Sequence, residues 1–502
     1  MVTRPALLGL DLGTSSVKAL LLGMDGAVLG SHAVGYRDDR PLPGWSEQDP
    51  EAWWRSTCAA VHGASQAAVR GHGGVEVVGI GLSGQMHTFV LVDEALRPLR
   101  PAITWMDTRA ESWLPRVRAA IDDAGLADAL ANPVVLGLSL LPLVWLREHE
   151  PSVLDRAHAF LVAKDVVRAR LTGVAAGEPT DASATLLCDV PKRAWSQRAA
   201  DVFDLPTAMF PPLGESAASA GTLRADAAAE LGLPPGLPVA FGAGDQQAAA
   251  VGMGTLRPGD AQLMVGTGAQ ALAVREGAER DPTGRLHTFC HVEGFVQQAS
   301  VNNAGAALEW VRSLLGLSWS ELYAAPVRRA GLPAFVPYLT GERTPLMKGH
   351  ARGAWLGVGA SHDARALAGA AVAGVVTSIR DGVEALRAHG EAPREIRGSG
   401  GGLRVASFAQ SLADALETPL TVVDQGSASG VGAALLGGVA AQVFADLVDA
   451  TARAAQADSV TYEPKPDAAD LWRARSAWRA ALDAMALHEH VAARPESADV
   501  TD

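Results

Sequence analysis

The chain has 502 residues, 48% of them hydrophobic and 19% charged, which is typical of a globular protein too long for a single hydrophobic core. Its formal net charge of −13 argues against a nucleic-acid partner, because such a protein needs a basic face. Three scattered cysteines indicate reduced thiols rather than disulfides. The sequence shows no charged-then-apolar leader, and the uncharged stretches 130–146 and 427–445 are better explained as interior segments than as membrane spans. We therefore expect a cytoplasmic protein without a membrane partner.

Apolar runs predict three antiparallel strands at the start of the chain. The runs cover residues 7–12, 17–22 and 28–34. Asp25-Gly26 is a typical hairpin turn between the last two. A helix is expected from Asp49 to Val69, with Asp49 as N-cap and Pro50 at the first helical position. Strands at 75–82 and 89–92 follow, so we expect a mixed sheet with helices on its faces.

Much of this pattern recurs after the proline-rich segment that ends at Pro238. The expected elements are strands at 239–242, 261–265 and 271–274, a helix beginning at 246, and a last helix at 471–487. Glycines 242, 244, 252 and 254 cluster at the expected junction, where a hinge between two mobile domains would need flexible backbone dihedral angles. We therefore predict a domain of residues 1–244, a second of residues 245–490, and a polar tail, 491–502. The duplication predicts an α/β fold of two ribonuclease H-like domains, the actin-like ATPase architecture, around a hinged cleft.

Two glycine-rich hairpins look like copies of one phosphate-holding device. The first is Asp11-Leu12-Gly13-Thr14-Ser15 and the second is Met264-Val265-Gly266-Thr267-Gly268. A strand that turns tightly on Gly and a hydroxyl residue leaves N–H groups pointing outward, where phosphate oxygens can bind. Each hairpin alone also fits an ordinary β-turn. Because only the first copy carries a carboxylate, the pair is typical of a phosphate-plus-metal site.

Further candidates lie at the ends of predicted strands. Asp245 follows a strand and precedes a helix, so its carboxylate can project into the cleft and accept a proton. Asp at this place is also a helix N-cap, and the two roles can coexist. The loop Arg397–Leu403 is glycine-rich but fails as a dinucleotide fingerprint, since Leu403 stands at the third glycine position. It fits either a flexible loop or a site for a flat ring. His287 and His291 have no fourth metal ligand nearby, which favours a structural role.

In their order along the chain, these motifs resemble those of the FGGY carbohydrate kinases, and within them the xylulokinases most closely. The resemblance covers roughly residues 5–440. The motifs that carry it are Asp11–Ser15, Gly44–Trp54, Gly84–His87, Trp105 with Asp107 and Arg109, Gly242–Asp245, Gly266–Gly268, Tyr338–Pro345 and Gly400–Gly402.

The resemblance implies ATP-dependent phosphorylation of a primary hydroxyl, with D-xylulose converted to D-xylulose 5-phosphate. Asp245 then corresponds to the general base, and Asp11 to the carboxylate that serves Mg²⁺, through water, and faces Asp245 across the closing gap. The sugar-pocket residues that it implies are Met86, His87, Asp107 and Asp245. The nucleotide-binding residues that it implies are Gly13, Thr14, Gly266, Thr267, Gly400, Gly401 and Gly402. A phosphate contact by Lys18 and a homodimer both stay open.

Some residues depart from the family pattern. Pro142 stands where a lysine is usual, and Leu346-Met347-Lys348-Gly349 replaces a His-Asn-Asp-Pro-like run. Gluconokinases share the Met86-His87 pair, so a gluconokinase or ribulokinase-like activity stays open. The glycine loop alone would also suit an oxidoreductase. A non-enzymatic actin-like nucleotide switch is the other alternative, although it has no need of Asp245 or of Met86-His87.

Overall fold

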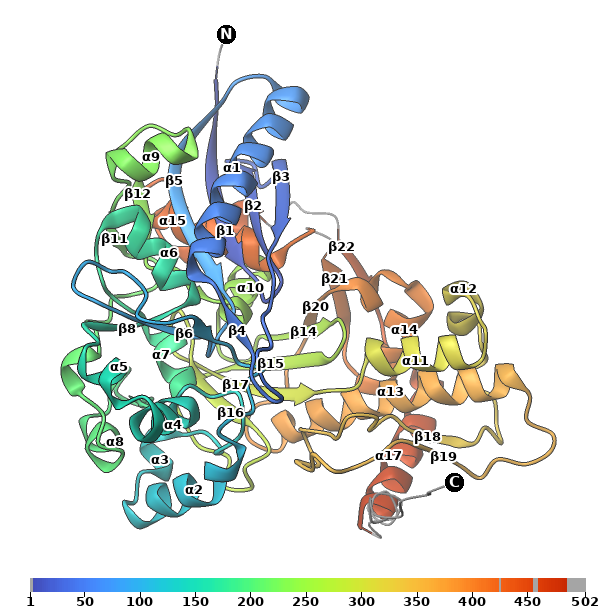
Figure 1. The fold of residues 1–502 in the computed structure, drawn as a ribbon. Helices are drawn as coiled ribbons and strands as arrows, with labels where there is room; N and C mark the ends of the chain where they lie inside the picture. Colours follow the sequence, from blue (N-terminus) through green and yellow to red (C-terminus); the bar gives the residue numbers. More distant parts are fainter. Residues whose placement is uncertain (1–2, 424–425, 455–458, 485–502) are drawn as a thin grey trace, which may run out of the picture.

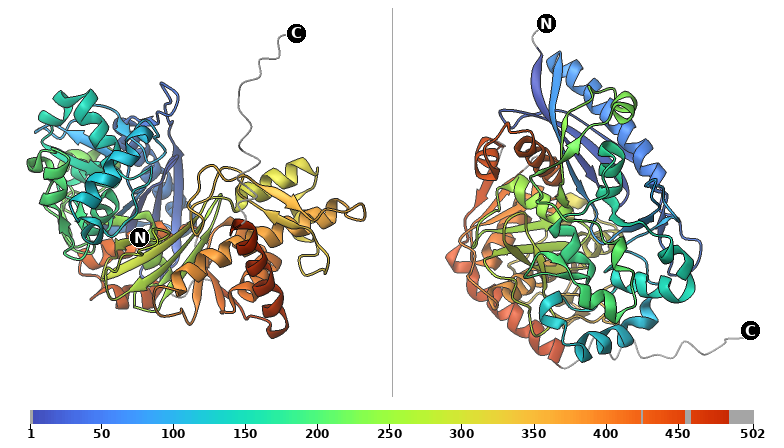
Figure 2. Two further views of the ribbon diagram at one scale, coloured as in Figure 1. Left: turned by 90° about the horizontal axis from the view of Figure 1, so that it is seen from below. Right: turned by 90° about the vertical axis from the view of Figure 1, so that its left-hand side faces the viewer.

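The computed structural model describes residues 3–423, 426–454 and 459–484. Its described part contains two seven-stranded sheets, one in each of two lobes that diverge in Figures 1 and 2. The first sheet has the order β11-β12-β5-β1-β2-β3, with β13 beside β5. Its strands are β1 (Arg4–Leu12), β2 (Ser16–Gly23), β3 (Val28–Gly35), β5 (Val75–Gly84), β11 (Ser219–Thr222), β12 (Pro238–Ala240) and β13 (Ala243–Gly244).

The second sheet has the order β16-β17-β15-β14-β20-β21-β22. Its strands are β14 (Ala261–Val265), β15 (Ala269–Arg275), β16 (His287–Cys290), β17 (Phe295–Val301), β20 (Ile396–Ser399), β21 (Leu420–Val423) and β22 (Ser459–Tyr462). Six strands of each sheet match in order and direction: β3-β2-β1-β5-β12-β11 corresponds to β17-β15-β14-β20-β21-β22. Along both series the pairs are antiparallel, antiparallel, parallel, parallel and antiparallel. The structure thus contains the recurrence that the sequence predicted.

The turn and capping residues near the start of the sequence correctly predicted the β2–β3 hairpin and the first helix. The β2–β3 turn closes with the Gly23 N–H donating to Ala27 O at 2.8 Å, and Gly26 has φ 81°. Helix α1 (Pro50–His72) begins as predicted, with the Asp49 carboxylate accepting from the Glu51 N–H at 3.0 Å. Strand β6 (Phe89–Val92) forms as predicted but belongs to a separate four-stranded sheet. That sheet has the order β4-β7-β6-β8, with β4 (Glu47–Gln48), β7 (Ala102–Ile103) and β8 (Ala159–Val162).

The lobe around this small sheet is largely helical (Figure 1). Its helices are α2 (Leu114–Asp123), α3 (Ala127–Leu130), α4 (Leu140–His149), α5 (Pro151–Asp155), α6 (Ala163–Thr172), α7 (Pro179–Ala182), α8 (Gln197–Val202) and α9 (Ala225–Leu231), with a two-stranded ribbon, β9 (Cys188–Asp189) and β10 (Ala194–Trp195). The stretch 130–146, which contains Pro142 in α4, packs into the hydrophobic core of this region, as expected.

The second lobe packs helices against its own sheet. They are α11 (Gly305–Leu314), α12 (Trp319–Tyr323), α13 (Ala364–Arg387), α14 (Ala406–Leu416) and α17 (Ala469–Ala484), with a ribbon of β18 (Ala334–Val336) and β19 (Ala354–Leu356). Helix α16 (Leu447–Ala454) instead packs into a core that contains Leu7 and Leu20 of the first sheet. By length and composition α13 could cross a membrane, but 89% of its most apolar window is buried inside the protein. The predicted last helix ends at Ala484 within the described residues, and the expected tail, 491–502, lies outside them.

Two helices join the lobes. Helix α15 (Ala428–Ala440) lies in the chain between β21 and β22 of the second sheet but packs on β1 and β5 of the first sheet, and also on α10 (Asp245–Met253). A β-carbon on Gly432 would lie 1.8 Å from Ala248 O, and one on Gly252 would lie 2.1 Å from Ala428 O. Gly252 thus allows close helix packing within α10, where the sequence suggested a soft link. The boundary near residue 244 stays a prediction.

Candidate active site

Asp11 lies near the end of β1, where three serine hydroxyls surround its carboxylate. Ser429 donates at 2.5 Å, Ser83 at 3.3 Å and Ser427 at 3.4 Å. Two of these serines belong to the segment that begins α15, which explains why a helix from the far end of the chain packs here. Burial raises the pKa of the Asp11 carboxyl, and the serine hydrogen bonds and Lys18 act in the opposite direction.

Asp245 lies on the same sheet edge as Asp11. In the strand register Asp11 is opposite Ser83 on β5, and Ser83 is opposite Ala243 on β13. Asp245 begins α10 two residues later. The expectation that the two carboxylates face each other from different domains is therefore wrong, because β13 pairs with β5 and carries Asp245 to the first sheet. Burial, followed by the charge of Asp11, raises the pKa of Asp245 to about 7.

A buried charged network holds the backbone just before Asp245. The Gly244 N–H donates to Thr180 Oγ1 at 2.8 Å, and the Thr180 hydroxyl donates to Glu178 Oε1 at 2.7 Å. The ammonium of Lys164 lies 3.2 Å from Glu178 and 2.9 Å from Asp181. Lys164 and Glu178 are fully buried. These contacts fix Gly244, and through it the start of α10.

A cavity of about 140 Å³ opens beside Asp245, lined by residues of both lobes. Of the predicted sugar-binding residues, Met86, His87 and Asp245 line it. The ring of His87 hydrogen-bonds Ala184 O at 2.7 Å, and burial lowers its pKa to about 4, so the imidazole is neutral at pH 7. Trp105 also lines the cavity, and its indole N–H donates to Thr14 Oγ1 at 3.1 Å. The cavity lining thus combines the polar side chains of Asp245 and His87 with the flat indole ring of Trp105.

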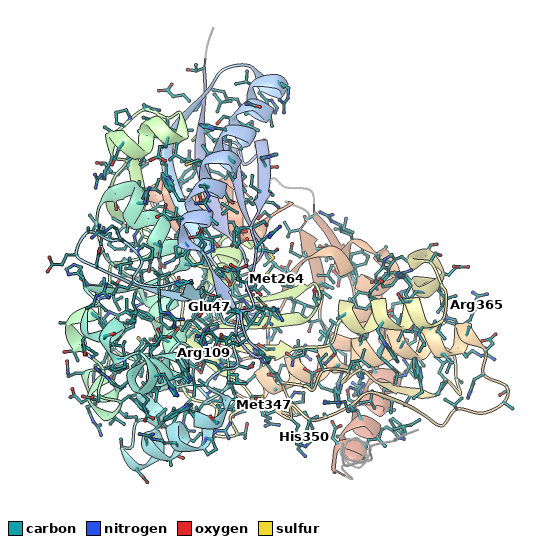
Figure 3. The ribbon with its side chains drawn as sticks, viewed as in Figure 1. Glu47, Arg109, Met264, Met347, His350 and Arg365 are labelled. Carbon is teal, nitrogen blue, oxygen red and sulfur yellow. The ribbon has the colours of Figure 1, made fainter. Side chains whose placement is uncertain are left out.

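Asp107 lies outside the lining of this cavity. Its carboxylate accepts from the Ser46 N–H at 2.7 Å and pairs with Arg109 at 2.7 Å. Arg109 also pairs with Glu47 at 2.8 Å and stacks 3.6 Å over the ring of Trp45. Glu47 and Arg109 are labelled together in Figure 3. These contacts occupy both oxygens of Asp107, which stabilises the lobe, and a sugar contact by Asp107 stays a prediction.

The second lobe supplies polar side chains that sequence reasoning missed. They are Gln270, His287, Gln298, Ser300 and Arg343, and Gln246 adds another from α10. Gln270 Oε1 accepts from the Ser300 hydroxyl at 2.7 Å and from the Gln298 amide at 2.9 Å. The available signal was the presence of glutamines inside otherwise apolar strands. His287 was expected to be structural; it stacks on Phe289 and lines the cavity.

A larger cavity of about 1220 Å³ lies in the second lobe. Of the predicted nucleotide-binding residues, Gly266, Thr267, Gly401 and Gly402 line it. Its aromatic lining consists of Trp310, Trp319, Tyr323 and Phe408. A β-carbon on Gly266 or Gly401 would have no other residue within 4 Å, so both backbones are open to a ligand. The volume, the exposed glycine backbones and the aromatic rings suit a nucleotide with its base and phosphates.

The other predicted nucleotide residues lie beside these surfaces. Gly400 has φ 115°, and a β-carbon there would lie 2.3 Å from Val265 O, so it permits close strand packing. In the first hairpin the Gly13 N–H donates to Ser16 O at 3.0 Å, and Thr14 lines the small cavity beside Asp245. The Lys18 ammonium donates to Gly426 O at 3.0 Å. Within the described residues no group of three or more His, Cys, Asp or Glu could hold a metal.

Comparison with known proteins assigns the chain to a family. The model for the N-terminal domain of the FGGY family of carbohydrate kinases matches residues 6–252, and the C-terminal domain model matches residues 261–441. The chain belongs to the FGGY family of carbohydrate kinases. The predicted family and its two-domain actin-like fold are therefore confirmed, and the oxidoreductase alternative is not.

Individual relatives agree over most of the chain. A xylulose kinase from Klebsiella pneumoniae is 36% identical over 414 residues, covering 81% of this chain and 84% of the relative. One from Escherichia coli strain K12 is 34% identical over 451 residues, covering 88% and 91%. The solved structure of a “xyloylose kinase” from Brucella ovis superposes with a TM-score of 0.87 at 34% identity, covering 96% of this chain and 100% of that one.

Proposed function

We propose that this protein transfers the γ-phosphoryl group of ATP to the primary hydroxyl of D-xylulose, forming D-xylulose 5-phosphate. The observation that carries the proposal is the place of Asp245, whose carboxylate lines the small polar cavity and lies on one sheet edge with Asp11. The relatives named xylulose kinases, similar over most of their length, support this sugar.

In the proposed reaction Asp245 accepts the proton of the sugar hydroxyl as its oxygen bonds to the γ-phosphorus. The bond to the bridging oxygen breaks, and ADP leaves with that electron pair. Such reactions ask the protein mainly for positioning and charge stabilisation. His87 and Trp105 would hold the sugar, while Gly266, Thr267, Gly401 and Gly402 would hold the nucleotide.

Asp11 is the residue placed to hold Mg²⁺, through water molecules, since Mg²⁺ keeps much of its hydration shell. The arrangement fits this role because Asp11 lies one residue before the end of β1, beside the Gly13–Thr14 turn, and among the described residues its carboxylate receives hydroxyl donors from three serines and no basic side chain. When bound, the ion would offset charge on the phosphate oxygens.

The test is a coupled ADP-release assay across D-xylulose, D-ribulose, D-gluconate and glycerol. We expect the highest kcat/KM with D-xylulose, and higher turnover of D-gluconate would refute the proposed sugar. Asp245→Asn should lower kcat by about 10²–10⁴, the usual contribution of a general base, while ATP still binds. Near-normal turnover in this variant would remove Asp245 from the mechanism.

A further inference from the structure

The motif Glu342-Arg343-Thr344-Pro345 brings a cation into the sugar cavity. Arg343 belongs to the second lobe, and its side chain lines the cavity together with Met86 and His87 of the first. A β-carbon on Gly137, which also lines the cavity, would lie 3.9 Å from Nη2 of Arg343. The guanidinium therefore reaches from one lobe to the lining loop of the other.

Both neighbours of Arg343 are anchored. The Glu342 carboxylate accepts from the Asn302 N–H at 2.6 Å. On the other side, the Thr344 N–H donates to Ser300 O at 2.9 Å, and the Ser300 N–H donates to Thr344 Oγ1 at 3.1 Å. The backbone that carries Arg343 is thus fixed from both sides, which limits how far the side chain can withdraw from the cavity.

No carboxylate among the described residues forms an ion pair with the Arg343 guanidinium, and the described hydrogen bonds include none from its side chain. Burial lowers its pKa, and the charge of Glu342 opposes that shift. The other titratable groups of the cavity are Asp245 and two histidines. Burial lowers the pKa of His87 to about 4 and of His287 to about 3, so both rings are neutral at pH 7. Burying a charge is costly unless it is paired and hydrogen-bonded, so this site is built to meet oxygen atoms of a ligand.

We propose that Arg343 binds the sugar substrate from the second lobe and that its charge also lets the cavity bind a five-carbon aldonate anion as a competitive ligand. The inference rests on the proposed function. The fork of N–H donors on a guanidinium matches two neighbouring oxygens, either sugar hydroxyls or a carboxylate. An aldonate differs from a ketopentose in carrying a carboxylate. Its affinity for the cavity therefore measures directly what the charge of Arg343 contributes to binding.

The test compares Arg343→Gln and Arg343→Lys with a control, Arg365→Gln. Arg365 is exposed at the start of α13 and is not part of the cavity lining; Figure 3 shows it at the opposite side of the molecule from Glu47 and Arg109. Loss of a hydrogen bond from a charged group should raise KM for D-xylulose roughly 10- to 100-fold in Arg343→Gln. KM for ATP should be unchanged, because the nucleotide cavity has a different lining. Arg343→Lys keeps the positive charge but not the forked N–H donors, so its KM for D-xylulose should lie between those of the wild type and Arg343→Gln.

Calorimetric titrations with D-xylonate and with xylitol, its neutral alditol counterpart, measure how much the ligand's negative charge contributes to binding. We expect the wild-type enzyme and Arg365→Gln to bind D-xylonate more tightly than xylitol, and Arg343→Gln to lose this preference while still binding ATP. An unchanged preference, or an unchanged KM for D-xylulose, would overturn the role of Arg343. If Arg343→Gln does not fold, the same two measurements on Arg343→Lys decide. Absence of ketopentose phosphorylation by the wild-type enzyme would instead refute the proposed function.

Discussion

Thr180→Val tests whether the buried network behind the active site positions Asp245. The Thr180 hydroxyl accepts from the Gly244 N–H at 2.8 Å and donates to Glu178 at 2.7 Å. Valine has nearly the same shape but makes neither contact, so it leaves the buried Gly244 amide without a partner. Glu178 loses one donor but keeps the backbone N–H groups of residues 180 and 181 and the ammonium of Lys164. A buried group left without its partner costs about 1–3 kcal/mol, so the unfolding free energy should fall by roughly that amount.

The same change should lower turnover. Gly244 immediately precedes Asp245 and would move once its N–H is no longer held. A displacement of about 1 Å at a reacting group can cost on the order of 10²-fold in rate. We therefore expect kcat for sugar phosphorylation to fall by up to that factor, with little change in KM for ATP, whose proposed site is lined by other residues.

Urea unfolding and steady-state kinetics of Thr180→Val give the two quantities. Thr180→Ser is the matched control, because serine keeps the hydroxyl and therefore both hydrogen bonds. It should stay close to the wild type in kcat and lose less stability than the valine variant. Wild-type kcat in Thr180→Val, with stability lowered as expected, would show that the network supports the fold without positioning Asp245.

Four further outcomes are expected. Since the pKa of Asp245 is raised to about 7 and only its ionised form accepts a proton, kcat/KM should fall about tenfold per pH unit below that value, and a flat pH–rate profile would contradict this. Between about pH 4 and pH 7 the Asp245 carboxyl keeps its proton in the folded state, whereas the unfolded chain releases it. The contribution of Asp245 to the unfolding free energy should therefore decrease as pH rises through this range, and urea titrations at several pH values would measure this decrease. Asp11→Ala should lose activity that added Mg²⁺ does not fully restore, and complete recovery in a MgCl₂ titration would exclude its metal role. Gly432→Ala should lower unfolding free energy by about 1–3 kcal/mol in thermal unfolding, because the new methyl meets Ala248 O, whereas Gly71→Ala, which has open space, should not.

The repeated part of the fold was predictable because its signals are local. A turn at Asp25-Gly26, a cap at Asp49 and two Gly-Thr hairpins each depend on a few adjacent residues, and the structure contains all of them. Contacts between residues that are far apart in the chain were harder to predict from the sequence. Nothing near Gly252 distinguishes a hinge from a helix contact, and that contact depends on Ala428, which is remote in the chain.

The site was predictable to the extent that its residues lie next to such hairpins. Met86 and His87 follow a predicted strand and line the small cavity beside Asp245, which is the proposed sugar site. Asp107 has the same polar character, but Arg109 and the Ser46 N–H occupy its carboxylate. Whether a carboxylate meets a ligand or a neighbouring arginine depends on the tertiary packing of the small sheet, which the spacing of the motif does not encode.

The shared sheet edge of Asp11 and Asp245 changes how lobe closure would act. Strands lie about 4.8 Å apart, and only β5 separates the strands that carry the two carboxylates. Their separation is therefore set by one sheet and should change little if the lobes move. What closure would alter is the distance from this pair to Gly266 and Arg343, both of the second lobe. In the proposed reaction the first lobe would hold the proton acceptor beside the sugar, and closure would bring the nucleotide and the Arg343 guanidinium to them. Phosphoryl transfer to water would then be slow in the open enzyme because the two halves of the site are apart, and sugar that contacts Arg343 would favour the closed one.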